Sequence, residues 1–124
     1  MDTTPNTFGE FFKERRIALA KTLREFCAEH GFDAGNTSKL ERGLLAPPQA
    51  GDKLEAYAKA LKLSKGTAEW RKFFDLAAAG AGVIPEDLKD ESVLKRLPLV
   101  FRTLRATKLS EKQLDKLIER LRGE

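Results

Sequence analysis

The chain of 124 residues has very few of the residues that form disulfides, metal sites and catalytic centres. It contains one cysteine, Cys27, and one histidine, His30. One cysteine forms no disulfide within the chain, and one cysteine with one histidine cannot complete a zinc site. The sequence therefore indicates a reducing, cytoplasmic setting, and it predicts no metal and no other cofactor.

Long apolar runs are also missing from the sequence. No stretch approaches the roughly 18 uninterrupted apolar residues that a membrane helix needs, so no membrane is expected as a partner. The first residues, MDTTPNT, lack the basic start and the apolar run of a signal peptide. The composition, with 41% hydrophobic and 34% charged residues, is typical of one compact domain or of a small domain with an appended helical arm.

Strand patterns are absent too, because no segment alternates apolar and polar residues. Apolar residues instead recur every three or four positions, which predicts an all-α fold. The consecutive prolines Pro47 and Pro48 interrupt this pattern. After them, Asp52 is predicted to cap a helix, Thr67 to start the next one, and the run AAAGAG at 77–82 to end it. The apolar stripes of these two helices are Leu54, Tyr57, Ala58 and Leu61, and Trp70, Phe73, Phe74 and Ala77.

The first helix is predicted by a cap and by a stripe. Thr7 and Glu10 match a capping box, in which each side chain binds the backbone N–H of the other residue. The helix is expected to run to about residue 20. Its charged residues are expected to face solvent, and one alternative places Lys13 or Arg16 against a phosphate. The apolar stripe consists of Phe8, Phe12 and Leu19, with Phe11 or Arg15 at its margin.

The stretch 22–43, TLREFCAEHGFDAGNTSKLERG, predicts two short helices joined by a tight turn. Thr22 caps the first helix, and Gly31 can adopt the left-handed conformation that ends it. Asp33 then caps a second helix from about residue 34 to residue 42. A helix, a turn with a glycine and a second helix with a small, polar outer face form the layout of a helix-turn-helix.

The excess of positive charge does not lie in this stretch. The net charge is +4 and the pI is near 9.3, which is compatible with a polyanionic partner. Met1–Pro48 contains 7 basic and 7 acidic residues, and Gln49–Leu94 contains 7 and 8. Lys95–Glu124 contains 9 basic and 4 acidic residues, a net charge of +5. Charge alone therefore does not indicate the helix-turn-helix.

A series of motif residues runs without a gap from the first helix to the end of the second short helix, and a proline follows it. The series consists of Phe8-Gly9-Glu10, Arg16, Thr22, Phe26-Cys27, Gly31-Phe32, Ser38-Lys39-Leu40-Glu41-Arg42-Gly43 and Pro47. In this order it resembles the Cro/C1-type (XRE) family of helix-turn-helix DNA-binding proteins, and KLEAYAKALKL resembles the next helix of that family. The resemblance covers about residues 7–63. It implies a lambda-repressor-like helix-turn-helix bundle over 7–80, with additional C-terminal helices.

The resemblance also implies that the second short helix lies in the major groove of double-stranded DNA. The groove-facing positions of the family fall on Ala34, Gly35, Asn36 and Lys39. Asn36 suits adenine N6 and N7, and Lys39 suits guanine O6 and N7. Ala34 and Gly35 let the backbone come close, and Ala34 can contact a thymine methyl group. This face is sparse, so it predicts one or two good base contacts.

Three further positions follow from the same resemblance. Arg42 matches a position that grips phosphate, and the free helix N-terminus at Thr22 is expected to do the same. Glu41 is implied to be a structural acid that ties helices together and not a catalytic group.

Four residues depart from the family pattern. Leu23 replaces a polar residue that contacts the DNA backbone, and it cannot make that contact. Cys27 replaces a small alanine and is expected to pack as a small apolar side chain. His30 is expected to pack at the helix end. Thr37 stands where the family buries isoleucine, so either the core is weaker there or neighbouring aromatic residues fill the space.

The last third of the chain, 83–124, is predicted to be a separate helical arm. Pro85 suits the first turn of a short helix, EDLKD, and Pro98 is expected to start or kink a helix. Ser110 and Gln113 match a second capping box. An apolar stripe in this arm needs a surface to bury it, and a second copy and another protein are both open as that partner. The stripe consists of Leu104, Leu109, Leu114, Leu117, Ile118 and Leu121.

The sequence thus predicts a sequence-specific DNA-binding transcriptional regulator. One such module reads few base pairs, so the resemblance implies a homodimeric repressor on a pseudo-palindrome, with recognition helices about 34 Å apart. The alternative is an antitoxin, which binds a toxin protein through residues past about Val83 and regulates its own operon through the helix-turn-helix. An enzyme is not predicted, because the chain has no Ser/His/Asp set, no paired carboxylates with a nucleophile and no phosphate loop.

Overall fold

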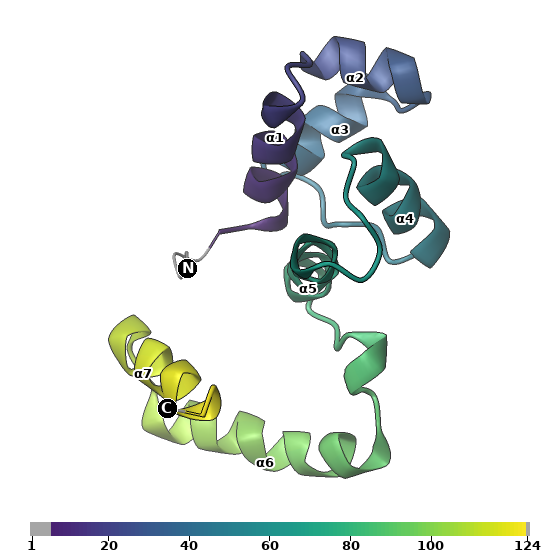
Figure 1. Cartoon of the computed structure of the whole chain (residues 1–124). Coiled ribbons are helices and arrows are strands. Elements are labelled where there is room, and N and C mark those ends of the chain that lie inside the picture. The colour runs from purple at the N-terminus through teal and green to yellow at the C-terminus, as the bar shows by residue number, and fades with distance from the viewer. Residues whose placement is uncertain (1–5, 124) are drawn as a thin grey trace. The chain divides into compact units, whose positions relative to one another are not determined.

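The computed structural model describes residues 6–123, and its secondary structure is helical throughout (Figure 1). This confirms the all-α fold class. By contacts the chain divides into two compact units, Met1–Pro85 and Glu86–Glu124. Among the described residues no helix has the length and apolar character to cross a membrane. The helices of the first unit are α1 (Phe8–Ala18), α2 (Leu23–His30), α3 (Ala34–Glu41), α4 (Gly51–Ala60) and α5 (Ala68–Ala81). Those of the second unit are the 3-10 helix η1 (Glu86–Leu88), α6 (Glu91–Thr107) and α7 (Glu111–Leu121).

Side chains next to the helices set most of the helix starts. The predicted capping boxes at Thr7 and Ser110 are present, and a third joins Thr22 and Glu25. Asp33 and Thr67 cap α3 and α5 through a side-chain oxygen. Each of these bonds satisfies an N–H group that has no partner within its helix.

The core of the first unit is built around aromatic rings. Phe12 is fully buried, and its ring lies edge-on to Phe26 at 5.7 Å and to Tyr57 at 5.2 Å between centroids. Phe73 of α5 is also fully buried and lies 4.9 Å from the ring of Phe8. Such pairs add about 0.5–1.5 kcal/mol each beyond the burial of their area. This core joins α1, α2, α4 and α5, and it provides the surface against which α3 is held.

Helix α1 touches the backbone of α3 directly at Gly9. A Cβ atom at this position would overlap the carbonyl oxygens of Leu40 and Glu41. Only glycine therefore allows the two helices to approach this closely. The contact fixes the C-terminal end of α3 against α1.

One residue predicted to face solvent from α1 is buried instead. Arg16 is 7% exposed, and its guanidinium lies against the carboxylate of Glu41. The alternative that Arg16 contacts a phosphate is therefore wrong as well. The local pattern failed here because the partner of Arg16 lies 25 positions away in the sequence.

One helix boundary also differs from the predictions. Helix α4 begins after Ala50, and Asp52 is a residue of its first turn and not its cap. An aspartate is favourable in either place, because both lie at the positive end of the helix dipole. The run 77–82 ends α5 as predicted, at its last residue, Gly82, which adopts the left-handed conformation. Within this run Gly80 lies against the ring of Pro47, where a Cβ atom would come within 3.0 Å.

The second unit consists of helices that bury none of their side chains fully. The short turn after Pro85 is the 3-10 helix η1. Asp90 caps α6, with its carboxylate 2.9 Å from the N–H of Val93, so the helix starts well before Pro98 and runs through it. Of the two alternatives for Pro98, a helix start is therefore wrong, because the cap at Asp90 sets the start. A kink at Pro98 stays a prediction. The apolar stripe predicted on α7 is exposed: its four residues, Leu114, Leu117, Ile118 and Leu121, are 38% to 78% exposed.

Candidate nucleic-acid interface

The turn between α2 and α3 is anchored by its backbone and by one ring. Gly31 has φ 74°, and its N–H donates to the carbonyl of Cys27. The N–H of Phe32 donates to the same carbonyl at 2.9 Å. The ring of Phe32 lies 4.4 Å from that of Tyr57, and His30 packs 5.0 Å from Phe26. The turn therefore holds α3 in one orientation relative to α2.

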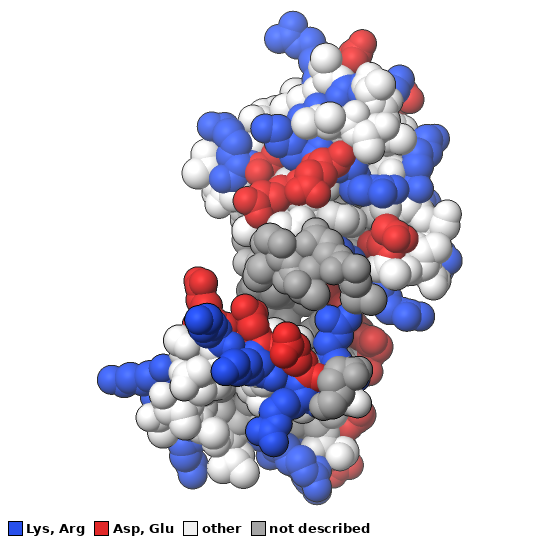
Figure 2. Space-filling model, turned by 60° about the vertical axis from the view of Figure 1, so that its left-hand side comes forward, with Lys and Arg blue, Asp and Glu red and all other residues white. Residues whose placement is uncertain are grey.

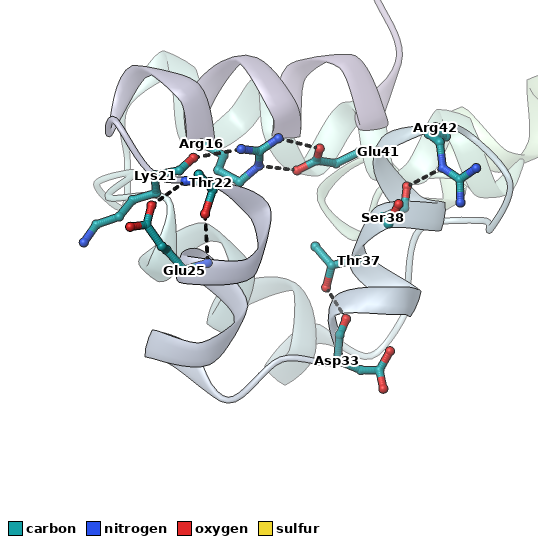
Figure 3. Close-up of polar contacts among 9 residues, drawn as sticks. All are labelled: Arg16, Lys21, Thr22, Glu25, Asp33, Thr37, Ser38, Glu41 and Arg42. Atoms are coloured by element: carbon teal, nitrogen blue, oxygen red, sulfur yellow. Dashed lines mark hydrogen bonds and ion pairs between the residues drawn. The ribbon is translucent and has the colours of Figure 1, made fainter.

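Buried groups hold the inner side of α3 in place. Thr37 is fully buried, and its hydroxyl donates to the carbonyl of Asp33 at 2.8 Å (Figure 3). Its methyl group thus packs in the core while its polar group is satisfied within the helix. Leu40, about one turn later in α3, is 5% exposed. The carboxylate of Asp33 accepts from the N–H of Asn36 at 2.7 Å and closes the start of the helix.

A buried ion pair fixes the end of α3. The guanidinium of Arg16 donates to both carboxylate oxygens of Glu41, at 2.7 Å and 2.9 Å (Figure 3). A third bond, at 2.8 Å, goes to the carbonyl of Lys21 in the connection between α1 and α2. The hydrogen bonds with Glu41 raise the pKa of the Arg16 guanidinium above its ordinary value. As the resemblance implies, Glu41 ties α3 to another helix.

The outer side of α3 carries most of the predicted contact residues. Gly35, Asn36 and Lys39 are exposed, and Arg42, the C-cap residue, is exposed beside them. At 3.6 residues per turn these four positions share one side of the helix, opposite Thr37. Within residues 6–123, Lys39 and Arg42 take part in no ion pair. The Nε atom of Arg42 lies 3.4 Å from the Ser38 carbonyl, so its other donors point into solvent.

Two of the predicted contact residues lie apart from this group. Ala34 is exposed in the first turn of α3, at the margin of the outer side. Thr22 lies on α2, and the N-terminus there is not free as predicted. The N–H of Thr22 donates to Glu25 at 2.9 Å, and the hydroxyl of Thr22 accepts from the N–H of Glu25 at 3.1 Å. The capping box leaves three groups that can donate to an anion: the backbone N–H groups of Leu23 and Arg24 and the hydroxyl proton of Thr22.

Charges around the start of α2 are largely paired with one another. The bonds from Thr22 lower the pKa of the Glu25 carboxyl, and the ion pair with Lys21 lowers that of Glu29. Lys21 lies 2.7 Å from Glu29 and is thus engaged within the chain. Arg24, which the motif comparison passed over, is exposed two residues after Thr22. Its position in the first turn of α2 is the sequence signal that makes it a candidate hydrogen-bond donor to a phosphate.

On the side shown in Figure 2 the surface charge does not separate into one basic face. Figure 2 shows Lys and Arg side chains interspersed with Asp and Glu side chains on the visible side of each unit. An interface with nucleic acid would therefore depend on a few placed donors more than on a broad positive field. Comparison of the chain with models of known protein families, with curated proteins and with solved structures finds no match.

Proposed function

We propose that this chain is a sequence-specific DNA-binding transcriptional regulator, a dimeric repressor that reads the major groove with α3. The observation that supports this most is the contrast between the two sides of α3. Its inner side is held by Thr37, Leu40 and the Glu41–Arg16 pair, whereas its outer side offers Asn36, Lys39 and Arg42 to solvent. A rigidly held helix with free, directed donors is what base recognition requires.

The chemistry of the outer side favours base contacts of two kinds. The amide of Asn36 can bind adenine N6 and N7, and the ammonium of Lys39 can donate to guanine O6 and N7. The small residues Ala34 and Gly35 keep the start of α3 narrow, which suits a close approach to the bases. Arg42 and the start of α2 at Thr22 serve the phosphates, which position the helix without reading sequence.

The proposal is tested by removing the two base-reading side chains. Asn36→Ala and Lys39→Ala each remove a side chain that makes no bond to the rest of the unit, so the fold is kept; the cap uses only the backbone of Asn36. Each variant is expected to weaken binding to the DNA upstream of the chain's own gene by roughly tenfold to a hundredfold. Footprinting locates the site, and fluorescence anisotropy gives the dissociation constant.

Lys59→Ala is the matched control, because Lys59 is an exposed lysine of the same unit on α4. It has the same effect on net charge as Lys39→Ala and is expected to change binding far less. If Asn36→Ala and Lys39→Ala both leave the footprint and the affinity unchanged, α3 is not the recognition helix.

An antitoxin remains a second candidate function, because the second unit exposes apolar residues on α6 and α7. In that case the same helix-turn-helix binds DNA, and a toxin protein covers the exposed residues. The two functions differ in what covers the second unit.

A further inference from the structure

The second unit cannot be stable through its own burial. It spans Glu86–Glu124, and neither α6 nor α7 has a buried residue. Units below about 40 residues usually need a disulfide, a metal or a partner chain to supply the missing burial. The one cysteine of the chain lies in the first unit. A partner chain can supply this burial.

Helix α6 has an apolar face with basic edges. Between Ser92 and Ser110 the sequence has five basic residues and no acidic one. Arg96 and Arg105 are exposed at the two edges of the face by helical spacing, and neither forms an ion pair within the described part of the chain. The residues that share the apolar face at helical spacing, called the α6 face below, are Val93, Leu94, Leu97, Val100, Phe101 and Leu104.

Helix α7 has a narrower apolar face with one acidic edge. Glu111, Asp115 and Glu119 follow one another at intervals of four, so they form one row along the helix. All three are exposed, and none has an ion-pair partner among the described residues. This row borders the apolar residues, called the α7 face below, which are Leu114, Leu117, Ile118 and Leu121.

We propose that a second copy of the chain covers both faces, with the α7 face of each copy packed against the α6 face of the other. Charge selects this arrangement. Two α6 faces side by side would bring their basic edges, with Arg96 and Arg105, together, whereas α7 presents its acidic row to a basic edge. The pairing is reciprocal, so it closes as a twofold dimer and leaves no face uncovered.

The exposed area is sufficient for such a dimer. Eight residues of the two faces are 38% to 78% exposed: Leu94, Val100, Phe101, Leu104, Leu114, Leu117, Ile118 and Leu121. Together they leave on the order of 700 Å² per copy, and a standard stable interface takes about 800 Å² from each partner. The apolar side chains supply the affinity, and the charged edges set the orientation.

The first test is the mass of the full chain in solution, measured by light scattering after gel filtration and by sedimentation. The wild-type chain is expected to be a dimer. Leu117→Asp occurs twice in a twofold interface and is expected to raise the dimer dissociation constant at least about a hundredfold. Because Leu117 is 40% exposed within its own chain, the change does not remove a core residue. Circular dichroism should therefore show that the helicity of the first unit is kept, with any loss no larger than the contribution of α6 and α7.

Leu99→Asp is the matched control on α6. Leu99 is 62% exposed and lies on the opposite side of α6 from Phe101 and Leu104. This variant is expected to remain a dimer. A monomeric wild-type chain, or a monomeric Leu99→Asp variant together with a dimeric Leu117→Asp variant, would overturn the proposal.

A charge exchange tests the reciprocal arrangement itself. One variant carries Arg96→Glu and Arg105→Glu, and the other carries Glu111→Lys and Asp115→Lys. Each variant alone would oppose like charges at both contacts and is expected to be monomeric. Their equimolar mixture restores opposite charges at both contacts and is expected to form a heterodimer.

The outcomes separate this inference from the other possibilities. Two variants that each stay dimeric alone would show that the helices pair in another way. A chain that is isolated from its host in equal proportion with a different protein, and that is monomeric without it, would mean that a toxin or similar protein covers the faces. DNA takes no part in these measurements, so failure of DNA binding in the Asn36 and Lys39 variants leaves this inference intact.

Discussion

Arg16 and Glu41 lie 25 positions apart in the sequence, and their charged groups are 2.7 Å apart in the structure. Their side chains are only 9% and 6% exposed. A buried ion pair gains little over apolar residues of the same size, because each charge has lost its water. Its effect on stability becomes large when one partner is removed, because the other charge then stays buried without a counter-charge. The pair therefore acts mainly as a constraint on where α3 ends.

Glu41→Ala is expected to destabilise the first unit by about 3–5 kcal/mol, because it leaves the Arg16 guanidinium buried without its carboxylate. Denaturant unfolding followed by circular dichroism measures this change. The control is Lys21→Ala, which breaks the exposed pair with Glu29 and should cost less than about 1 kcal/mol. Equal losses for the two variants would contradict a special role for the buried pair.

At the scale of the element, the capping box at the start of α2 makes that helix sensitive to acid. The pKa of the Glu25 carboxyl is lowered in the folded chain by its bonds with Thr22. A lowered pKa means that the folded chain favours the charged carboxylate more than the unfolded chain does. The resulting stability is present above the unfolded pKa, near 4.5, and is lost as the pH falls through the folded pKa.

Glu25→Gln keeps a capping group but removes this titration. The melting temperature of the wild type is expected to exceed that of Glu25→Gln at pH 6, and the difference should shrink as the pH falls below about 4.5. The contribution of Glu29 is common to both proteins and cancels in the difference. Glu69→Gln is the control, because Glu69 is a first-turn carboxylate of α5 that belongs to no capping box. If the difference in melting temperature between the wild type and Glu69→Gln shrinks in the same way as the pH falls, the capping box at Thr22 is not the cause.

The sequence predicted the elements well where the signal is local. Caps such as Thr7, Thr22 and Ser110 each lie within three residues of the backbone groups that they satisfy, so a short stretch of sequence shows both partners. The exposed positions of α3 follow from the same local periodicity. The all-α fold class needs only this information.

The errors concern contacts between distant residues or competition between local signals. Arg16 looks like a surface residue until Glu41 is placed beside it. Pro98 suggests a helix start, but the cap at Asp90 acts earlier and the helix continues through the proline. None of these partners is within one helical turn in the sequence.

At the scale of the whole molecule, the two units divide the burial of apolar surface unequally. The buried apolar side chains all belong to the first unit among the residues described, and the second unit keeps its large apolar residues exposed. The first unit thus has a core of its own, whereas the described part of the second unit has no buried apolar residue. We propose that the first unit binds DNA and that the second unit joins two copies of the chain. Because one α3 makes few base contacts, most of the gain in affinity is expected to come from the simultaneous binding of the α3 helices of both copies.

A chain that ends at Pro85 tests this division. It keeps every buried core residue, so it is expected to fold with the helicity of the first unit and to be monomeric. Its affinity for the complete pseudo-palindromic site should fall at least about a hundredfold, while its affinity for a half-site should stay that of the full chain. Anisotropy with the two DNA lengths measures both.

Leu117→Asp in the full chain keeps the basic residues of α6, so an equal loss of affinity in this variant assigns the effect to pairing. If the shortened chain binds the complete site as tightly as the full chain, the second unit does not pair the reading helices.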